Sequence, residues 1–291
     1  MISGTATGRV SWRTLFVLGR VSNLPTVWSN CLAGWILGGQ SDWDHFLALC
    51  GGATFLYLGG MFLNDAFDAQ FDQEHRPERP IPSGAISVSA VWKWGLSWIG
   101  LGLLVLILLG TKPALFAALL TVGILLYDAV HKMFAFSPLL MAACRFLLFL
   151  LAAAVGFNGI SGFSIWCAVV LAAYIVGLSY IAQRESIFTP LRYWPCVFLA
   201  APLVLGLIVN RGAYQVRGTI LAAILVLWVL RCLRHVLWSE QKNAGRCVSG
   251  LLAGIVLVDL LAVCPADPAL ISAFAALFAL ALLGQRFVPA T

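Results

Sequence analysis

The sequence predicts an all-α fold, a polytopic bundle of nine to ten transmembrane helices, and two features support this prediction. Of the 291 residues, 61% are hydrophobic and 10% are charged, whereas about 25% are charged in a typical soluble domain. Apolar runs of roughly 17 to 25 residues, enough to cross a hydrocarbon core about 30 Å thick, recur from residue 24 to residue 285. Backbone polar groups in hydrocarbon must be satisfied within each segment, and the period-2 alternation of a membrane barrel is absent, so these runs are helices.

Ten apolar segments qualify as spans, and together they predict a single membrane-embedded domain over residues 1–291. They cover residues 24–40, 45–63, 89–110, 113–130, 137–157, 163–182, 193–210, 217–237, 247–264 and 268–285. The segment Cys264-Pro265-Ala266-Asp267-Pro268 either separates the last two spans or bends a single one, so nine and ten spans both stay open. No Gly/Ser linker, low-complexity tract or obvious repeat marks a second domain.

The distribution of basic residues predicts the orientation of the chain. Lys and Arg are retained on the cytoplasmic side of a membrane, and a cytoplasmic N-terminus places 14 of the 18 basic residues there. These are Arg9, Arg13, Arg20, Arg76, Arg79, Lys93, Lys132, Arg184, Arg192, Arg231, Arg234, Lys242, Arg246 and Arg286. We therefore expect an integral multi-pass protein of the inner (plasma) membrane, with its N-terminus and longest loops in the cytoplasm.

The net charge of +6 follows from this asymmetry and predicts contact with anionic membrane lipids, not with nucleic acid. The first 22 residues contain arginines but no continuous apolar core, so they are not expected to be a cleaved signal peptide. Eight cysteines lie in or beside apolar spans without a CxxC pair, and we interpret them as small packing residues.

Carboxylates gather where the second span ends, in Asn64-Asp65-Ala66-Phe67-Asp68-Ala69-Gln70-Phe71-Asp72. Asn64, Asp68 and Asp72 follow the i, i+4, i+8 spacing of one helical face, and Asp65 lies three residues before Asp68. Neighbouring carboxylates repel, so this carboxylate stripe is costly unless cations neutralise it. Oxygen ligands without His or Cys suit Mg²⁺, which one or two carboxylates and a substrate phosphate commonly hold. The stripe thus predicts a Mg²⁺ site for a phosphate or diphosphate.

The loop after the stripe contains groups that can bind phosphate. It reads Gln73-Glu74-His75-Arg76-Pro77-Glu78-Arg79-Pro80-Ile81-Pro82-Ser83-Gly84. Arg76 and Arg79 carry planar guanidinium groups that fork onto phosphate oxygens, and the prolines stiffen the loop. The alternative is a solvated charged loop, which the regular spacing of the stripe and the adjacent Arg-Pro pairs disfavour.

The stripe and the Arg-Pro loop resemble the first aspartate-rich signature of the UbiA superfamily of membrane-embedded prenyltransferases. Two further elements extend the resemblance over roughly the first 190 residues: Arg20-Val21-Ser22-Asn23-Leu24-Pro25, and Tyr127-Asp128-x-x-His131-Lys132. These two elements are most similar to the EboC-type subgroup.

The resemblance implies a UbiA-like bundle around a cavity, a Mg²⁺-bound prenyl diphosphate at the cytoplasmic mouth, and prenyl transfer to an aromatic or other lipophilic acceptor. By position it implies metal binding by Asn64, Asp65, Asp68 and Asp72, with Asp65 and Asp68 also catalytic. It implies that diphosphate oxygens are held by Arg20, Asn23, Arg76, Arg79 and Lys132. Mg²⁺ and cationic side chains would stabilise charge on the departing diphosphate.

The second aspartate-rich motif of the family is reduced in this chain. Where relatives carry DxxxD at the end of the sixth span, this chain has Ser179-Tyr180-Ile181-Ala182-Gln183-Arg184-Glu185-Ser186, with Glu185 as its only acid. Three interpretations stay open. One Mg²⁺ with the arginines suffices, Gln183 and Glu185 form a reduced metal site, or the protein binds a prenyl lipid without turning it over.

Four ionisable residues elsewhere complete the candidate set. Asp128 and His131 could remove a proton from an acceptor, or they could form a plain polar helix end. Arg145 lies within the fifth span, where charge is expensive, and either faces the diphosphate or pairs structurally. Asp259, in the ninth span, is expected to reach toward the outer membrane surface.

Mg²⁺-dependent prenyl transfer is the leading functional hypothesis. Its alternative is a prenyl-lipid binding or transport protein on the same fold, because the second motif is reduced. The chain lacks paired Gly/Pro-interrupted segments in two matching halves, which disfavours a transporter of another kind. A lipid-phosphate transferase of the CDP-alcohol type ranks third, because its Asp-Gly and Ala-Arg elements are not found near Asp65.

Overall fold

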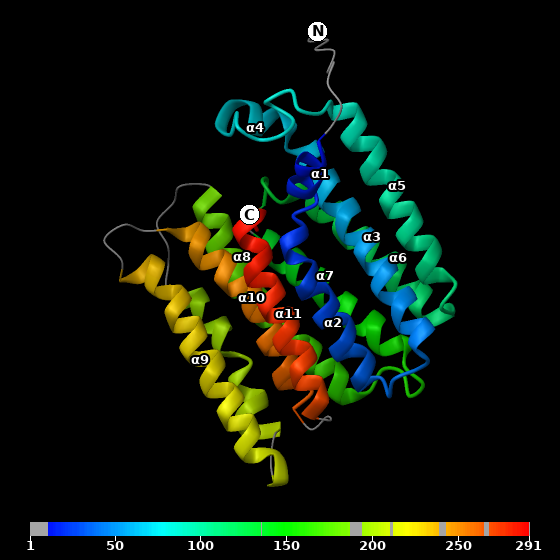
Figure 1. The fold of residues 1–291 in the computed structure, drawn as a ribbon, viewed down its shortest axis with the longest axis vertical. Coiled ribbons are helices and arrows are strands. Elements are labelled where there is room, and N and C mark those ends of the chain that lie inside the picture. The colour runs from blue at the N-terminus through cyan, green and yellow to red at the C-terminus, as the bar shows by residue number, and fades with distance from the viewer. Residues whose placement is uncertain are drawn as a thin grey trace.

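The computed structural model describes residues 11–134, 136–186, 194–209, 212–238, 243–264 and 268–290, and every regular element in these ranges is a helix (Figure 1). Eight of the described helices are long and apolar enough to cross a membrane. They are α3 (Trp43–Phe67), α5 (Val88–Ile107), α6 (Thr111–Val130), α7 (Ser137–Val155), α8 (Gly162–Ser186), α9 (Gln215–Leu237), α10 (Ala244–Ala262) and α11 (Pro268–Phe287). The prediction of an all-α, multi-pass membrane protein is confirmed.

The other two predicted spans are shorter than expected, so the prediction of nine to ten spans is approximate. The first is α2 (Leu24–Leu37), which ends where Gly39 and Gln40 adopt left-handed backbone conformations that a helix cannot continue. The second is broken into a 3₁₀ helix, η2 (Trp194–Ala200), and a π-helix, η3 (Leu205–Val209). A further 3₁₀ turn, η4 (Gly212–Tyr214), precedes α9.

The last two apolar runs form separate helices, because α10 and α11 pack side by side (Figure 1). The sequence break between them, residues 265–267, lies outside the described residues. The chain therefore has two helices here and not one bent helix.

Small residues let neighbouring helices approach closely, as is common between helices in membranes. A Cβ atom built at Gly34 of α2 would lie 2.5 Å from the Phe149 carbonyl oxygen of α7. A Cβ atom built at Gly102 of α5 would lie 2.9 Å from the Gly52 carbonyl oxygen of α3. These contacts hold α2 against α7, and they hold α3, which carries Asn64 and Asp65, against α5.

Short helices and loops collect at one end of the bundle, and the candidate site lies there. Helices α1 (Trp12–Leu18) and α4 (Ala69–His75) both lie at this end, where α3 finishes and α5 begins (Figure 1). The short 3₁₀ helix η1 (Val21–Asn23) joins α1 to α2, and α11 packs against it. The C-terminal end of the chain thus returns to the same end as the carboxylate stripe.

Candidate active site

The carboxylate stripe spans the junction between α3 and α4. Asn64 and Asp65 lie in the last turn of α3, Asp68 ends that helix and caps the next, and Asp72 lies in α4. Asp68 keeps a right-handed helical backbone, and the amides of Asp68 and Asp72 donate to the carbonyls four residues earlier at 3.0 and 2.9 Å. The predicted helical spacing therefore persists across the junction, and all four residues are at most 7% exposed.

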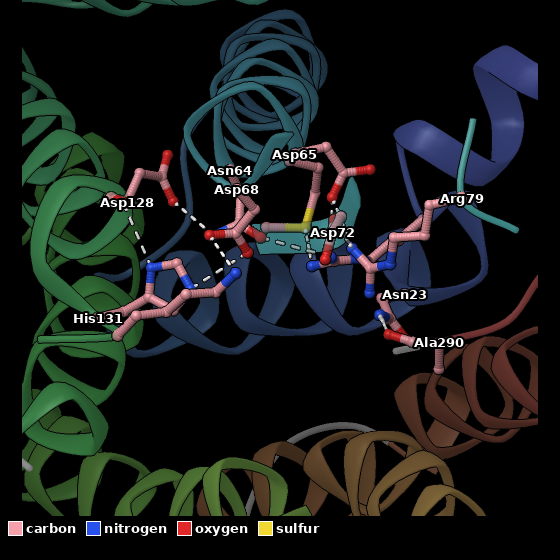
Figure 2. A network of polar contacts seen from close by, with 12 residues as sticks. Asn23, Asn64, Asp65, Asp68, Asp72, Arg79, Asp128, His131 and Ala290 are labelled. Carbon is pink, nitrogen blue, oxygen red and sulfur yellow. Dashed lines mark hydrogen bonds and ion pairs between the residues drawn. The ribbon is translucent and has the colours of Figure 1, made fainter. Parts of the chain in front are cut away.

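Two arginines from different segments converge on Asp65. Arg79 Nη1 lies 3.0 Å from Asp65 Oδ1 and 3.4 Å from Asp72 Oδ2, so it bridges two carboxylates. Arg20 Nη2 lies 3.1 Å from the same Asp65 oxygen and donates to Asn64 Oδ1 at 3.4 Å. The structure thus brings these predicted metal-binding and diphosphate-binding residues together (Figure 2).

The backbone at Arg20 is strained. Its φ of 40° and ψ of 49° are left-handed values that residues other than glycine seldom adopt, and such strain tends to persist at functional sites. The Tyr57 hydroxyl donates to the Arg20 carbonyl at 3.2 Å, and Met61 Sδ accepts from Arg20 Nη1 at 3.4 Å. Helix α3 therefore positions both the acids and the arginine that pairs with them.

Asp68 pairs with the end of α6 and the loop that follows it. Lys132 Nζ lies 2.8 Å from Asp68 Oδ1, and His131 Nε2 lies 3.4 Å from Asp68 Oδ2. Burial raises the pKa of Asp68, but hydrogen bonds from His131 and Lys132 outweigh burial and leave this pKa below its usual value. Lys132 Nζ also lies 3.6 Å from the centre of the Phe71 ring, in a cation–π contact.

Asn64 links the part of the site on α3 to the part at the end of α6. Its Nδ2 donates to Asp128 Oδ1 at 3.2 Å, which links α3 to α6 (Figure 2). The second oxygen of Asp128 is buried and has no hydrogen-bond partner among the described residues, and the same holds for Asp72 Oδ1. A buried carboxylate oxygen without a partner carries a desolvation cost, so both atoms are free to accept a ligand.

Positive charge is also crowded in the Arg-Pro loop. Burial and the charge of Arg20 lower the pKa of Arg79 from the usual arginine value, with a smaller contribution from Arg76. Asp65 and Asp72 oppose this shift. Arg76 follows α4 directly and is half-buried. The site therefore holds arginines whose mutual repulsion an additional anion would relieve.

Asn23 lies near the site and contacts the C-terminal end of the chain. Its Nδ2 donates to the Ala290 carbonyl at 2.9 Å (Figure 2), and its Oδ1 is buried without a partner among the described residues. The role of Asn23 toward a diphosphate stays a prediction.

Arg145 lies in a separate buried network that joins α2, α7 and α10. Its guanidinium donates to Asn30 Oδ1 at 2.8 Å and to Thr26 Oγ1 at 3.0 Å. Asn30 and Ser29 both donate to Asp259 Oδ2 at 2.6 Å. The expectation that Asp259 reaches toward the membrane surface is wrong, because it is 0% exposed and bound to α2. The structure does not bring Arg145 to the carboxylate stripe.

The reduced second motif lies at the end of α8. The side chain of Glu185, predicted as a metal ligand, lies outside the described residues. Gln183 Nε2 donates to the Phe134 carbonyl at 3.4 Å, in the loop that follows Lys132. This hydrogen bond connects the second motif to the loop after α6 that also carries Lys132.

The residues of the stripe fit a Mg²⁺ ion by their chemistry. Carboxylate and amide oxygens are the ligands that Mg²⁺ takes, and Asp72 and Asp128 each offer a buried oxygen without a partner among the described residues. No group of three or more His, Cys, Asp or Glu side chains in the described ranges is arranged closely enough to hold a metal ion. In this arrangement arginine and lysine side chains neutralise the acids.

Sequence reasoning missed several residues that support the site. Tyr57 lies seven residues before Asn64, two turns along the same helix, so its spacing could have revealed it. Tyr127 was part of a recognised element but had no assigned role, and it stacks on His131 with ring centres 5.0 Å apart. Thr26, Ser29 and Asn30 showed only as polar residues within an apolar span, and their partners come from remote helices.

The fold and the site together define a membrane-embedded helical bundle with a buried cluster of carboxylates and cationic side chains at one end. The model of the UbiA prenyltransferase family matches residues 22–288. The chain therefore belongs to the UbiA prenyltransferase family, as its motifs predicted.

Curated relatives match part of the chain. The digeranylgeranylglyceryl phosphate synthase of Sulfolobus acidocaldarius is 40% identical over 80 residues, which is 28% of each chain. The synthase of the same name from Methanoregula boonei is 30% identical over 118 residues, 40% of this chain and 39% of the relative. The chain thus spans less than half the length of these relatives.

Solved structures of UbiA homologues share the fold. A homologue from Aeropyrum pernix K1 superposes with a TM-score of 0.63 at 16% identity, over 88% of this chain and 98% of that one. A homologue from Archaeoglobus fulgidus bound to DMAPP and Mg²⁺ superposes with a TM-score of 0.55 at 15% identity, over 95% and 99% of the two chains. At these identities the likeness concerns the fold alone.

Proposed function

We propose that this protein is a Mg²⁺-dependent prenyltransferase that moves a prenyl group from a prenyl diphosphate to an aromatic or other lipophilic acceptor within the membrane. The supporting observation is the pairing of acids and cations in the site. Asp65, Asp68 and Asp72 are each paired with Arg20, Arg79 or Lys132. A ligand that carries both a metal and a diphosphate would give the acidic side chains the metal as a partner and the cationic side chains the diphosphate.

Binding would exchange partners without leaving buried charge unpaired. Asn64, Asp65, Asp68 and Asp72 would hold Mg²⁺, and Arg20, Arg76, Arg79 and Lys132 would turn to the diphosphate oxygens. Guanidinium forks suit these oxygens because they bind them in pairs. When bound, Mg²⁺ would supply Lewis-acid stabilisation of the charge that develops on the leaving group.

The chain's own residues account for the transfer step. The C–O bond between the prenyl carbon and the diphosphate breaks with its electron pair left on the diphosphate, where the arginines and Lys132 stabilise it. A nucleophilic atom of the acceptor forms the new bond to that carbon and loses a proton. His131 and Asp128 border the site and are the proposed proton acceptors.

The relatives support the donor class more firmly than the acceptor. A UbiA homologue of Archaeoglobus fulgidus was solved with DMAPP and another time with GPP, each with Mg²⁺. The curated relatives are named for the synthesis of digeranylgeranylglyceryl phosphate. We propose a prenyl diphosphate donor, and a site at the cytoplasmic face of the inner (plasma) membrane, where the positive-inside asymmetry puts the Arg-Pro loop.

A prenyl-lipid binding or transport protein is the second candidate, favoured by the reduced motif at the end of α8. Glu185 is the only acid there, and Gln183 contacts the Phe134 carbonyl. In this alternative the stripe would bind a prenyl diphosphate with Mg²⁺, but no acceptor would be prenylated.

One experiment separates the two candidates. Purified protein in phosphatidylcholine nanodiscs would receive labelled prenyl diphosphates of several chain lengths, Mg²⁺ and a panel of lipophilic acceptors. We expect Mg²⁺-dependent diphosphate release, lost in Asp68→Ala but kept in the control Asp44→Ala, whose carboxylate lies exposed at the opposite end of α3. Mg²⁺-dependent binding without release at any chain length would favour the carrier, and binding unaffected by Asp68→Ala would contradict the metal assignment.

A further inference from the structure

A second charged site lies apart from the carboxylate stripe. A cavity of about 490 Å³ opens between the C-terminal ends of α9 and α11 and the N-terminal end of α10. Arg231, His235, Arg246 and Arg286 line it, and none of the lining residues that the structure describes is Asp or Glu. Within the part of the chain that the structure describes, the three arginines form no salt bridge. Among the described residues, the cavity therefore gathers positive charge without a carboxylate to neutralise it.

Hydrogen bonds fix the shape of this cavity. Trp228 Nε1 of α9 donates to the Gly250 carbonyl of α10 at 2.8 Å, and Gln285 Nε2 of α11 donates to the Ser249 carbonyl at 2.9 Å. A Cβ atom built at Gly250 would lie 2.5 Å from Cys232 Sγ, so α9 and α10 are in close contact. The cavity is thus a defined feature between three joined helices and not a loose gap.

Exposed aromatic side chains place the cavity at the depth of lipid headgroups. Trp238 ends α9 and is 67% exposed, and Phe287 ends α11 and is 77% exposed. Tryptophan is enriched at the interface between membrane and water. Arg231 lies two turns before Trp238 on α9, which puts the cavity close to the expected depth of the lipid phosphates.

The walls of the cavity continue into surfaces that face hydrocarbon. Helix α11 is the least buried of the candidate spans, with 11% of its apolar window inside the protein. Leu230 of α9, next to Arg231, and Leu283 of α11, three residues before Arg286, are 46% and 50% exposed. A headgroup held by the arginines would therefore have acyl chains lying along these helices, whereas a free phosphate would leave that apolar surface unused.

We infer that this cavity binds the phosphate-bearing headgroup of an anionic membrane lipid, in a site separate from the one that binds substrate. Basic pockets between transmembrane helices recognise such headgroups, and each Lys or Arg near the surface adds to the attraction. The described lining of the cavity contains no carboxylate, which sets it apart from the stripe, because a Mg²⁺-bound diphosphate needs acids to hold the metal.

Lipid binding by the full chain tests this inference independently of prenyl transfer. The protein would be purified from nanodiscs containing phosphatidylcholine and phosphatidylglycerol, and native mass spectrometry would measure the ratio of the two lipids retained. The combined variant Arg231→Gln, Arg246→Gln, Arg286→Gln is expected to lower the preference for phosphatidylglycerol at least about tenfold, as the loss of three cationic contacts implies.

The matched control removes the same charge elsewhere on the same predicted membrane face. It combines Arg13→Gln, Lys93→Gln and Arg234→Gln, all exposed and none in the cavity lining. We expect it to keep the wild-type preference. An equal loss in both variants, or no loss in the cavity variant, would overturn the inference.

Two further arms identify the source of the phosphate and guard against misfolding. Displacement of phosphatidylglycerol from the wild type by inorganic phosphate, or by a prenyl diphosphate without Mg²⁺, would overturn the headgroup assignment in favour of a free anion. If the combined variant does not purify as a folded protein, Arg286→Gln alone must shift the preference in the same direction. An unchanged preference in that variant would also overturn the inference.

Discussion

The Nδ2 atom of Asn64 donates a 3.2 Å hydrogen bond to Asp128 Oδ1, and this contact joins two of the signature elements of the chain. Asn64 begins the carboxylate stripe on α3, and Asp128 belongs to the Tyr-Asp-x-x-His-Lys element at the end of α6. The other Asp128 oxygen is buried and has no partner among the described residues. The Asn64 amide thus holds one oxygen of the Asp128 carboxylate in place, and the other oxygen is available to a ligand.

This arrangement predicts opposite effects of Asp128→Asn with and without ligand. The variant keeps the shape of the side chain and can keep the hydrogen bond from Asn64, and it replaces a buried carboxylate, whose charge is costly to desolvate, with a neutral amide. We expect the ligand-free protein to melt at the same or a higher temperature. The additional stabilisation by Mg²⁺ and prenyl diphosphate should fall, as measured by thermal unfolding in nanodiscs. A variant stabilised by ligand as strongly as the wild type would show that Asp128 does not contribute to binding.

Arg79 should be needed for stability even before ligand binds, because it bridges Asp65 and Asp72. Removing one partner of a buried ion pair leaves the other uncompensated and costs on the order of 3 kcal/mol. We expect Arg79→Gln to lower the melting temperature of the ligand-free protein, whereas Arg79→Lys restores part of it. Both should weaken diphosphate binding, because lysine lacks the planar fork. Arg13→Gln, at an exposed position, is the control, and an equal effect there would refute the specific role of Arg79.

The pairing of Asp68 with Lys132 predicts a pH dependence with a definite sign. Hydrogen bonds from His131 and Lys132 hold the pKa of Asp68 below its usual value despite burial, so folding favours the ionised carboxylate. Its contribution is present above the unfolded pKa, about 4 for Asp, and is lost as pH falls through the lower folded value. The difference in melting temperature between wild type and Lys132→Met should therefore be constant from neutral pH to about 5 and shrink below 4. A difference that grows on acidification would contradict this pairing.

The sequence predicted the fold class, and it predicted which residues of the stripe lie together, for physical reasons that particular residues illustrate. Apolar runs must be helices in hydrocarbon, and the eight long spans were predicted on this ground. The predicted lengths were wrong for two spans, residues 24–40 and 193–210. α2 ends early because Gly39 and Gln40 turn left-handed, and residues 194–209 form 3₁₀ and π turns. The stripe was recognisable because its members are close in sequence, and i, i+4 spacing survives the break at Asp68.

Contacts between distant helices could not be predicted in the same way. The pairing of Asp65 with Arg20 crosses 45 residues, and that of Asp68 with Lys132 depends on how α3 packs against α6. Asp259 was misplaced because its position near the end of α10 does not show which neighbouring helix its side chain contacts. Its partners, Ser29 and Asn30, lie on α2, more than 200 residues away in the chain.

That buried network yields a last prediction, which decides between the two roles considered for Arg145. Asn30 lies between Arg145 and Asp259 and binds both, so either charge alone would be left without compensation. We expect Arg145→Met and Asp259→Leu each to destabilise the protein by roughly 3 to 5 kcal/mol, and the double variant to recover much of the loss, as buried pairs replaced by apolar residues often do.

The measurement is a double-mutant cycle of thermal unfolding, paired with prenyl diphosphate binding in each variant. A structural pairing requires that the double variant regain stability and bind the diphosphate nearly as well as the wild type, because neither residue contacts the stripe. If stability returns but diphosphate affinity stays low in every variant that lacks Arg145, the guanidinium acts on the diphosphate instead. If the losses of stability in the two single variants add up in the double variant, Arg145 and Asp259 do not interact.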